Sequence, residues 1–250
     1  MNYGLQLYSV RDAAEKDFAA MLRQVAGMGY RMVEPAGFFG VKAEDVAAML
    51  KEYGLTVSGT HTGVKVLTDD FAGTVAYHHI IGCDDLIIPG ARHSTAAEVS
   101  VLVHQINHFQ PMLEAEGIRL HYHNHSSEFL PNKDGQIVHD ELASRTRVLF
   151  ELDTFWIFNA GLSPIDLMEK YRDRMRFIHL KDGLCQNFSD PQSRAQGKSL
   201  GDGEAPVAQI RKKAIELGLG MVVESEGLEP TGPDEVRRCI EYLRRLDAAD

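Results

Sequence analysis

Three histidines at alternate positions of one short segment are the first feature of this chain that could do chemistry. The stretch RLHYHNHSSEF, residues 119–129, contains His121, His123 and His125 and then Glu128. Successive side chains of an extended strand point to opposite faces, so the three imidazoles are expected on one side. Imidazoles bind divalent metals and exchange protons near neutral pH, which indicates a metal or acid-base site.

Other ionisable residues follow other short apolar segments. Buried carboxylates and imidazoles are costly unless they are paired or bind a metal. A ring of such residues therefore predicts a divalent cation at its centre. By alternation, Asp153 shares a face with Glu151, His179 with Lys181, and Glu224 with Glu226, so each pair can point inward. The residues expected at strand ends are Glu34, His61, His123, His125, Asp153, His179, Lys181 and Glu224.

The elements that must position these residues alternate regularly. Eight apolar segments are predicted strands, and amphipathic stretches with helical spacing lie between them. This order predicts a single (β/α)8 TIM barrel over residues 1–250, with its active site at the carboxyl ends of the strands. The longest irregular segment, about 183–205, is expected to be functional, and its GDGE is expected to be a turn. The strand segments are 4–10, 31–37, 56–63, 85–90, 119–125, 148–154, 176–182 and 221–227.

The charge composition of the chain limits the classes of partner that it is expected to bind. The chain has 36 acidic and 26 basic residues and a formal net charge of -10, which argues against nucleic acid or an anionic membrane as the main partner. Small neutral ligands and metal cations fit better, and a homo-oligomer remains open. No basic cluster stands out in a strand-end loop, which favours an unphosphorylated substrate.

The cysteines and the start of the chain suggest a cellular location. Cys83, Cys185 and Cys239 are scattered and form no CxxC pair, so they are expected to be reduced thiols. The start MNYGLQLYSVRD shows no targeting pattern, and no run of about 18 apolar residues occurs. We therefore expect a soluble, cytoplasmic protein.

Seven motifs carry a resemblance to a known family. GLQLYSVRD, VEPAGFFG, YHNHSSEF, ELDTFW, HLKD, LGDGE and VVESEG occur in order across almost the whole chain. In these motifs the chain resembles the xylose-isomerase-like TIM barrel superfamily, the group of sugar phosphate isomerases and epimerases that also includes endonuclease IV.

The resemblance implies one divalent metal ion, manganese, magnesium, cobalt or zinc, held by residues of strands five to eight. Three ligands carry over to Asp153, His179 and Glu224. Where relatives have a glutamate on the fifth strand, often in ENH, this chain has HNH, which puts His123 in the ligand's place. His125 and Glu128 are the rival ligands.

That departure affects the expected mechanism. Relatives that epimerise ketoses use two metal-bound glutamates as opposed acid and base, and here one is replaced. The metal is instead expected to acidify a C–H next to a carbonyl, with proton transfer by Glu224 or an imidazole. Glu34, His125 or Glu128 would assist as acid or base, and Lys181 would stabilise the enediolate oxygen and bind substrate.

Several residues have plainer interpretations. His121, deepest in its strand, is expected to be an interior histidine. Glu151 and Glu226 are expected in internal ion pairs, and Asp182 in bonds to backbone. His61 either contacts substrate or caps a loop. Phe38, Phe39, Phe155 and Trp156 either wall a sugar pocket, where Trp156 would bind substrate, or pack in the core.

Four functions are compatible with these patterns. The leading prediction is a metal-dependent isomerase or epimerase acting on a sugar or keto-sugar through an enediolate. An alternative is a metal-dependent lyase or dehydratase acting on an inosose or oxidised glycoside. A barrel that binds a sugar or metal without catalysis is a further alternative. Phosphodiester cleavage as in endonuclease IV fits least, because it needs more metal ligands and the chain is acidic.

Overall fold

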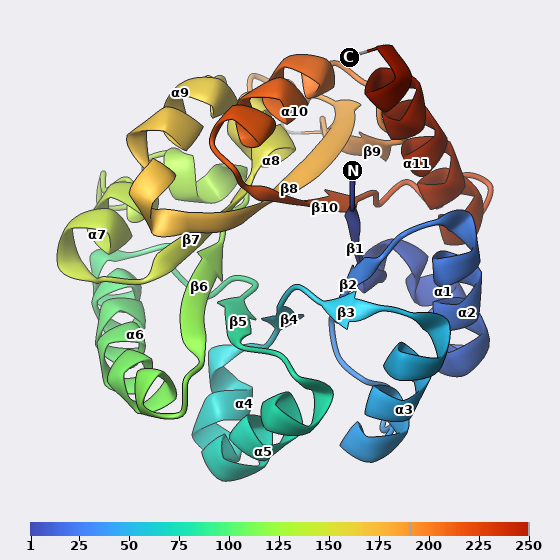
Figure 1. Cartoon of the computed structure of the whole chain (residues 1–250). Coiled ribbons are helices and arrows are strands. Elements are labelled where there is room, and N and C mark those ends of the chain that lie inside the picture. The colour runs from blue at the N-terminus through green and yellow to red at the C-terminus, as the bar shows by residue number, and fades with distance from the viewer. Residues whose placement is uncertain (191, 250) are drawn as a thin grey trace.

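The predicted strands lie side by side in one curved sheet (Figure 1). The structure is a computed structural model that describes residues 1–190 and 192–249. The sheet order of its parallel strands is β3-β2-β1-β10-β8-β7-β6-β5-β4. The strands are β1 (Gly4–Gln6), β2 (Met32–Glu34), β3 (Thr56–Val57), β4 (Thr60–His61), β5 (Asp85–Ile88), β6 (Arg119–His123), β7 (Leu149–Asp153), β8 (Met175–Leu184) and β10 (Gly220–Glu224).

The third predicted strand, 56–63, closes the barrel. It is divided into β3 and β4, which pair with β2 and β5 at the two ends of the sheet order. The break falls at Ser58 and Gly59. A Cβ on Gly59 would lie 2.2 Å from the Cδ1 of Ile87, so only glycine lets the strand approach β5 there. The chain therefore adopts the (β/α)8 TIM barrel that the alternating pattern predicts.

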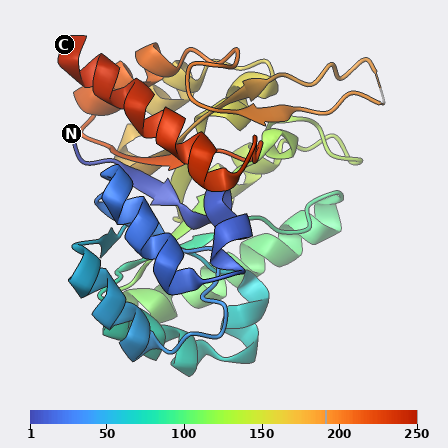
Figure 2. The same cartoon turned by 90° about the vertical axis from the view of Figure 1, so that its right-hand side faces the viewer.

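Helices surround the sheet on its outer side (Figures 1 and 2). The N-cap of α2 shows how the sequence sets their limits, because Asp17 accepts a hydrogen bond from the amide of Ala20. At its other end the left-handed Gly29 stops the helix. The helices are α1 (Arg11–Ala14), α2 (Phe18–Met28), α3 (Ala43–Tyr53), α4 (Val64–Asp69), α5 (Phe71–Ile81), α6 (Ala96–Ala115), α7 (Val138–Arg145), α8 (Thr154–Asn159), α9 (Pro164–Lys170), α10 (Val207–Glu216) and α11 (Gly232–Ala249). Among the described residues, none of these helices has the length and apolar character needed to span a bilayer.

The first strand is shorter than predicted. Pairing stops at Gln6, and a 3-10 helix, η1 (Leu7–Val10), follows. The Gln6 side chain accepts the amide of Tyr8 and caps this turn. Its amide nitrogen donates to the Glu34 carboxylate at 2.8 Å, so the last paired residue of β1 also positions Glu34.

The segment predicted as an irregular loop is partly ordered as a hairpin. Strand β8 continues to Leu184 and pairs with the antiparallel β9 (Gln196–Lys198), and Figure 2 shows this arm projecting beyond the barrel. The Asp182 carboxylate accepts hydrogen bonds from the amides of Gly183, Gly201, Gly203 and Ala205. This confirms the prediction that Asp182 binds backbone, and it makes LGDGE the turn that leads to α10.

Candidate metal centre

Four strands bring the predicted ligands to one place inside the barrel. His123 ends β6, Asp153 ends β7, His179 lies within β8 and Glu224 ends β10. All four side chains are buried. Each offers a ligand atom, and these atoms all lie within 4.8 Å of one another. The alternation of side chains along the strands therefore brings these four residues together on the inside of the barrel.

His179 lies at the centre of this cluster and uses both ring nitrogens. Its Nδ1 lies 3.3 Å from Glu224 Oε2 and 4.0 Å from Asp153 Oδ2. Its Nε2 lies 2.7 Å from Glu34 Oε1 on the other side of the ring. A proton on Nε2 would be donated to Glu34 and leave the Nδ1 lone pair facing the two carboxylates.

Orphaned polar atoms show that this cluster suits a cation. Within the described residues, His123 Nδ1, Asp153 Oδ2 and Glu151 Oε1 are buried and have no hydrogen-bond partner. Such atoms normally cost free energy unless a ligand or ion satisfies them. Two imidazoles with two carboxylates form a donor set of the kind that binds zinc, manganese or cobalt. The residues present therefore fit one divalent metal ion.

A second group of potential ligands overlaps the first. It comprises His61, Glu151, His123 and His179, so it shares two histidines with the first group. Here the atoms already bond to one another: His61 Nε2 lies 3.0 Å from Glu151 Oε2 and 3.1 Å from Glu34 Oε1. His61 thus neither caps a loop nor stands free, since it joins two carboxylates. The expected internal pairing of Glu151 is confirmed.

Lys181 provides a fixed positive charge beside the cluster. Its Nζ donates to Glu224 Oε2 at 3.0 Å and also to Glu226, which confirms the expected internal pair of Glu226. Asp153 Oδ2 is 3.8 Å away. The ammonium also lies 4.7 Å from the ring centroid of Trp156, a cation–π distance. Lys181 therefore holds the carboxylate of Glu224 while its own position is set by Trp156.

The electrostatics of the cluster reflect crowded negative charge. Burial, together with the neighbouring Glu34 carboxylate, raises the pKa of Glu151 to about 7. Burial likewise raises the pKa of Asp153 to about 7, against the pull of Lys181. Burial opposes the charged form of His179, but Glu151, Glu34 and Glu224 outweigh it and raise its pKa well above the ordinary value. The carboxylates thus exceed the positive charge available from the described side chains around them.

A cavity of about 510 Å³ opens onto the cluster. His123 and Glu224 reach its floor, and His125 lines it with its ring 5.7 Å from that of Trp156. The other lining residues come from the strand-end loops, namely Tyr8, Ala36, Gly37, His61, Pro89 and Glu226. The cavity is therefore where a small polyol could meet both the cluster and the predicted acid-base residues.

Two predicted acid-base residues do not line this cavity. Glu34 is completely buried and accepts hydrogen bonds from Gln6 and the His179 ring, which places it behind the cluster as a support. Glu128 faces away from the cluster, because its carboxylate contacts Tyr122 and His93 and accepts the amide of His125. The structure therefore separates Glu128 from the metal ligands and leaves His123 and His125 as the fifth-strand candidates.

Some residues that support or line the site were not predicted from the sequence. Asn124 exchanges hydrogen bonds with the backbone of Asp153, which fixes the end of β7 against β6. Gln6 supports Glu34, and Tyr8 and Pro89 line the cavity. A signal existed for Gln6 and Tyr8, since both lie in the GLQLYSVRD motif. Asn124 lies between the two histidines of HNH. Because side chains alternate along a strand, it points to the opposite face from both of them, and this could have indicated a role outside the ligand group.

Comparisons with known proteins agree with this geometry. Proteins named inosose dehydratase are similar to the chain: one from Geobacillus kaustophilus is 24% identical over 187 residues, 65% of this chain and 61% of that protein. Another, from Clostridium beijerinckii, is 26% identical over 48% of this chain and 39% of its own length. The chain thus aligns with only about 40 to 60% of the length of these curated relatives.

Solved structures match over nearly the whole chain. A protein described as a sugar phosphate isomerase/epimerase from Parabacteroides distasonis superimposes with a TM-score of 0.80 and 26% identity, covering 97% of both chains. A probable 3-DHS dehydratase from Bacillus anthracis superimposes with a TM-score of 0.76 over 98% of this chain and 99% of that one, and at 12% identity it shows the shared fold alone. The sequence model of the family described as xylose isomerase-like TIM barrel matches residues 22–246. The chain belongs to the xylose isomerase-like TIM barrel family.

Proposed function

We propose that this protein is a divalent-metal-dependent isomerase or epimerase that acts on a sugar or keto-sugar by proton transfer through an enediolate. The observation that carries the proposal is the convergence of His123, Asp153, His179 and Glu224, with orphaned polar atoms among them, at the floor of a polyol-sized cavity. Manganese, magnesium, cobalt or zinc would be held by these four residues. When bound, such an ion supplies Lewis acidity, which polarises a carbonyl and makes the neighbouring C–H acidic.

The side chains around the cluster divide the remaining work. Glu224 lines the cavity and is the proposed base, with its carboxylate held by Lys181. The Lys181 ammonium also supplies positive charge where an enediolate oxygen would develop. Trp156 would pack against one face of the sugar, since its ring lies between His125 and Lys181. His61 and His125, which line the same cavity, are the proposed substrate contact and second acid-base group.

The histidine on the fifth strand makes the two faces of the site unequal. Glu224 offers a carboxylate to the cavity, whereas His123 and His125 offer imidazoles. An epimerase that uses this site would therefore take a proton with the carboxylate and return one from an imidazole. An aldose–ketose isomerase or a lyase needs a base on one face only.

A second candidate is a lyase or dehydratase with the same first step. The names of the similar proteins from Geobacillus and Clostridium favour it, because both are inosose dehydratases. After proton removal by Glu224, loss of a β-hydroxyl as water would give an unsaturated ketone. His125, which lines the same cavity as Glu224, is the proposed acid that protonates that leaving hydroxyl.

One experiment separates these functions. The Mn²⁺-loaded protein is incubated in D₂O with D-fructose, an inosose and a methyl 3-ketoglucoside, and the products are weighed by mass spectrometry. An isomerase or epimerase exchanges a carbon-bound hydrogen for solvent deuterium and keeps every other atom, whereas a lyase releases water or methanol. The His179→Ala variant is the control and should be inactive. Bound metal with no deuterium in any of the three compounds would contradict the proposal and favour a non-catalytic sugar-binding barrel.

A further inference from the structure

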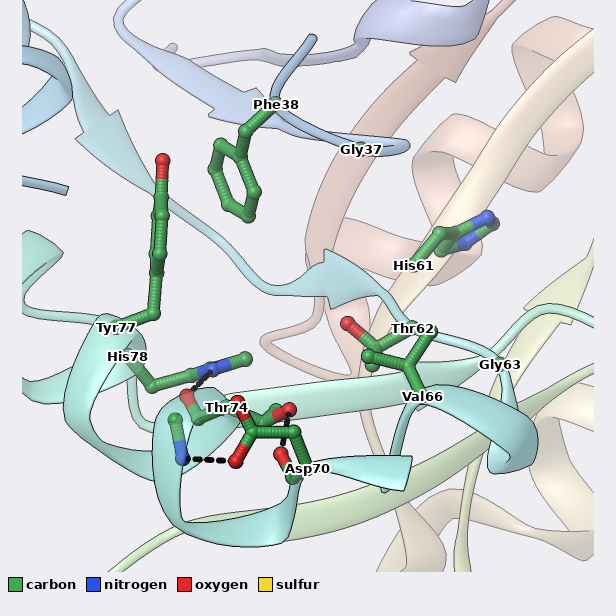
Figure 3. A pocket seen from close by; sticks show the side chains of 11 residues that line it. Gly37, Phe38, His61, Thr62, Gly63, Val66, Asp70, Thr74, Tyr77 and His78 are labelled. Carbon is green, nitrogen blue, oxygen red and sulfur yellow. Dashed lines mark hydrogen bonds between the residues drawn. The ribbon is translucent and has the colours of Figure 1, made fainter. Parts of the chain in front are cut away.

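A second pocket of about 330 Å³ adjoins the cavity above the metal centre (Figure 3). It lies between the loop after β2 and the short helices α4 and α5. Gly37 and His61 line both spaces, so the pocket opens from the side wall of the proposed active site. Whatever binds at the cluster can extend a substituent past His61 into this second space.

The walls of this side pocket are apolar. Figure 3 shows the rings of Phe38 and Tyr77 along one side and Val66 across from them. The two rings lie 4.2 Å apart between centroids, and the hydroxyl of Tyr77 donates to the backbone oxygen of Val41. Val66 is 50% exposed despite its apolar side chain. The pocket thus presents rigid aromatic surface and a solvent-exposed aliphatic group, both of which gain from contact with an apolar ligand.

Its polar groups are already satisfied within the protein. Asp70 uses a carboxylate oxygen to cap α5 at Gly73. His78 bonds through one ring nitrogen to Thr60 and through the other to the Thr74 backbone oxygen. No lysine or arginine is among the described lining residues. The lining histidines His61 and His78 are likewise bonded within the protein, so the described lining leaves no cationic group free for a phosphate or carboxylate.

From these observations we infer that the side pocket binds an uncharged, apolar, ring-sized substituent attached to the sugar at the metal centre. This inference rests on the proposed function, and it narrows the substrate class to a keto-glycoside or similar derivative, which keeps the carbonyl that an enediolate needs, instead of a sugar phosphate. The size agrees, because a closed apolar cavity of about 150 Å³ already accommodates benzene, and this pocket is roughly twice as large. The linkage between ring and sugar would pass beside His61 and Gly37.

The pocket can be tested by itself, independently of any reaction at the metal. Phenol is titrated into the isotope-labelled full chain, and backbone amide shifts are followed by NMR. The amides of Gly63 and Gly73, which line the pocket, should move with millimolar phenol. Val66→Asp should weaken phenol binding at least about tenfold, since it places a charge on the apolar wall. Unmoved amides, or equal binding by the variant, would overturn the inference.

A matched variant controls for surface charge. Val101→Asp changes another exposed valine, on α6 and 57% exposed, which does not line the side pocket. It should bind phenol as the native protein does. Val66 lies in the first turn of α4, where an aspartate is well tolerated by the helix dipole, so the fold of Val66→Asp should be kept.

A second measurement links the pocket to the sugar site. Calorimetry on the Mn²⁺-loaded protein compares phenyl and methyl β-D-glucopyranoside, and we expect the phenyl compound to bind at least about tenfold more tightly. Val66→Asp should bring the two affinities within about twofold. Equal affinities in the native protein would count against the inference even if both sugars bind. Phenol binding without any metal-dependent glycoside binding would instead count against the proposed function and leave the pocket in place.

Discussion

Two clusters of charge inside the same barrel have opposite character. At the amino ends of the strands, Asp85 accepts hydrogen bonds from Arg119 and His121, and Arg176 lies 3.2 Å away. At the carboxyl ends, His123 and Asp153 keep buried atoms without partners. His121 and His123 are two residues apart on one strand and share a face. Among the described residues the Nδ1 of His121 also lacks a partner, so the two histidines differ in the Asp85 carboxylate that meets the Nε2 of His121, and not in their spacing.

The pKa values follow the same division. Burial opposes the charge on Asp85, but hydrogen bonds from Arg119 and His121 outweigh it and lower its pKa to about 2. Burial raises the pKa of Asp153 to about 7, because Lys181 only partly compensates for the neighbouring Glu224. A carboxylate whose charge is satisfied by the fold supports stability, whereas one that lacks a partner is available to a ligand.

The largest expected effect comes from removing the central imidazole of the cluster at the carboxyl ends of the strands. His179→Ala should lower the affinity for Mn²⁺ at least about a hundredfold, because it removes a ligand and frees Glu34 from its partner. Glu224→Ala should behave similarly. Bound metal is measured by elemental analysis after dialysis, and far-UV circular dichroism checks the fold. Full metal occupancy in both variants would refute the ligand assignment.

Two single substitutions distinguish the roles of His123 and His125 on the fifth strand. His123→Ala should lose metal as His179→Ala does, since its Nδ1 is a buried atom without a partner. His125→Ala should keep the metal and lose turnover, because His125 lines the cavity outside the ligand group. Metal content and turnover are measured on the same preparations. Loss of metal from His125→Ala alone would exchange the two roles.

A substitution in the cluster at the amino ends of the strands should lower stability and leave the metal affinity unchanged. Asp85→Ala leaves His121 buried with an unpaired Nε2, so we expect it to reduce the free energy of unfolding by about 3 kcal/mol. Its affinity for Mn²⁺ should stay within about twofold of the native protein. Urea denaturation and metal titration give the two values. If Asp85→Ala releases metal as strongly as His179→Ala, the two clusters form one coupled network and the comparison fails.

Much of both clusters could be predicted from the sequence, because alternation along a strand is a local property. It predicted that His123, Asp153, His179 and Glu224 can face inward, and the family resemblance then selected them as ligands. It also marked His121 as an interior residue, which its bond to Asp85 confirms. The partners of Glu34 could not be foreseen in this way. Its contact with His179 spans 145 residues and depends on how far β2 reaches into the barrel.

Contacts between residues distant in the sequence also explain the other differences between the predicted and the observed structure. Glu128 follows the histidines in sequence, but a 3-10 turn, η2 (Ser126–Phe129), directs it back to the amide of His125 and to Tyr122 behind the strand. The division of the third strand at Gly59 depends on its approach to Ile87, and the β8–β9 arm depends on a long-range pairing. Local patterns predict which face a side chain takes, and they do not predict which distant group meets it.

A smaller effect tests whether Glu34 supports the metal centre from behind. Glu34→Gln keeps the size of the side chain but removes the charge that orients the His179 ring, so affinity for Mn²⁺ should fall about 10- to 100-fold. Glu128→Gln is the matched control, because it neutralises an equally buried carboxylate outside the cluster, and it should change affinity by less than about twofold. Calorimetric titration measures both. Equal effects would show that charge alone, and not contact with His179, matters.

The smallest effect concerns a third kind of buried histidine. His139 packs against the rings of Phe129, Phe150 and Tyr171, and burial lowers its pKa to about 3. The unfolded chain protonates this residue below about pH 6.5, whereas the folded protein does not, so stability is lost as the pH falls from 6.5 toward 3. The His139→Phe variant does not lose stability in this way. Its free energy of unfolding, relative to that of the native protein, should therefore rise by about 2 kcal/mol when the pH is lowered from 7.5 to 5.

Urea denaturation at the two pH values measures this gain, and His104→Phe on the exposed side of α6 is the control that should show none. A histidine with no facing carboxylate then weakens the fold in acid. His121 has Asp85 as a hydrogen-bond partner, and His123 would gain a partner in a bound cation. If His139→Phe gains nothing at pH 5, burial alone does not keep an imidazole neutral in this barrel, and the absence of a partner at His123 would lose its force as a sign of a metal site.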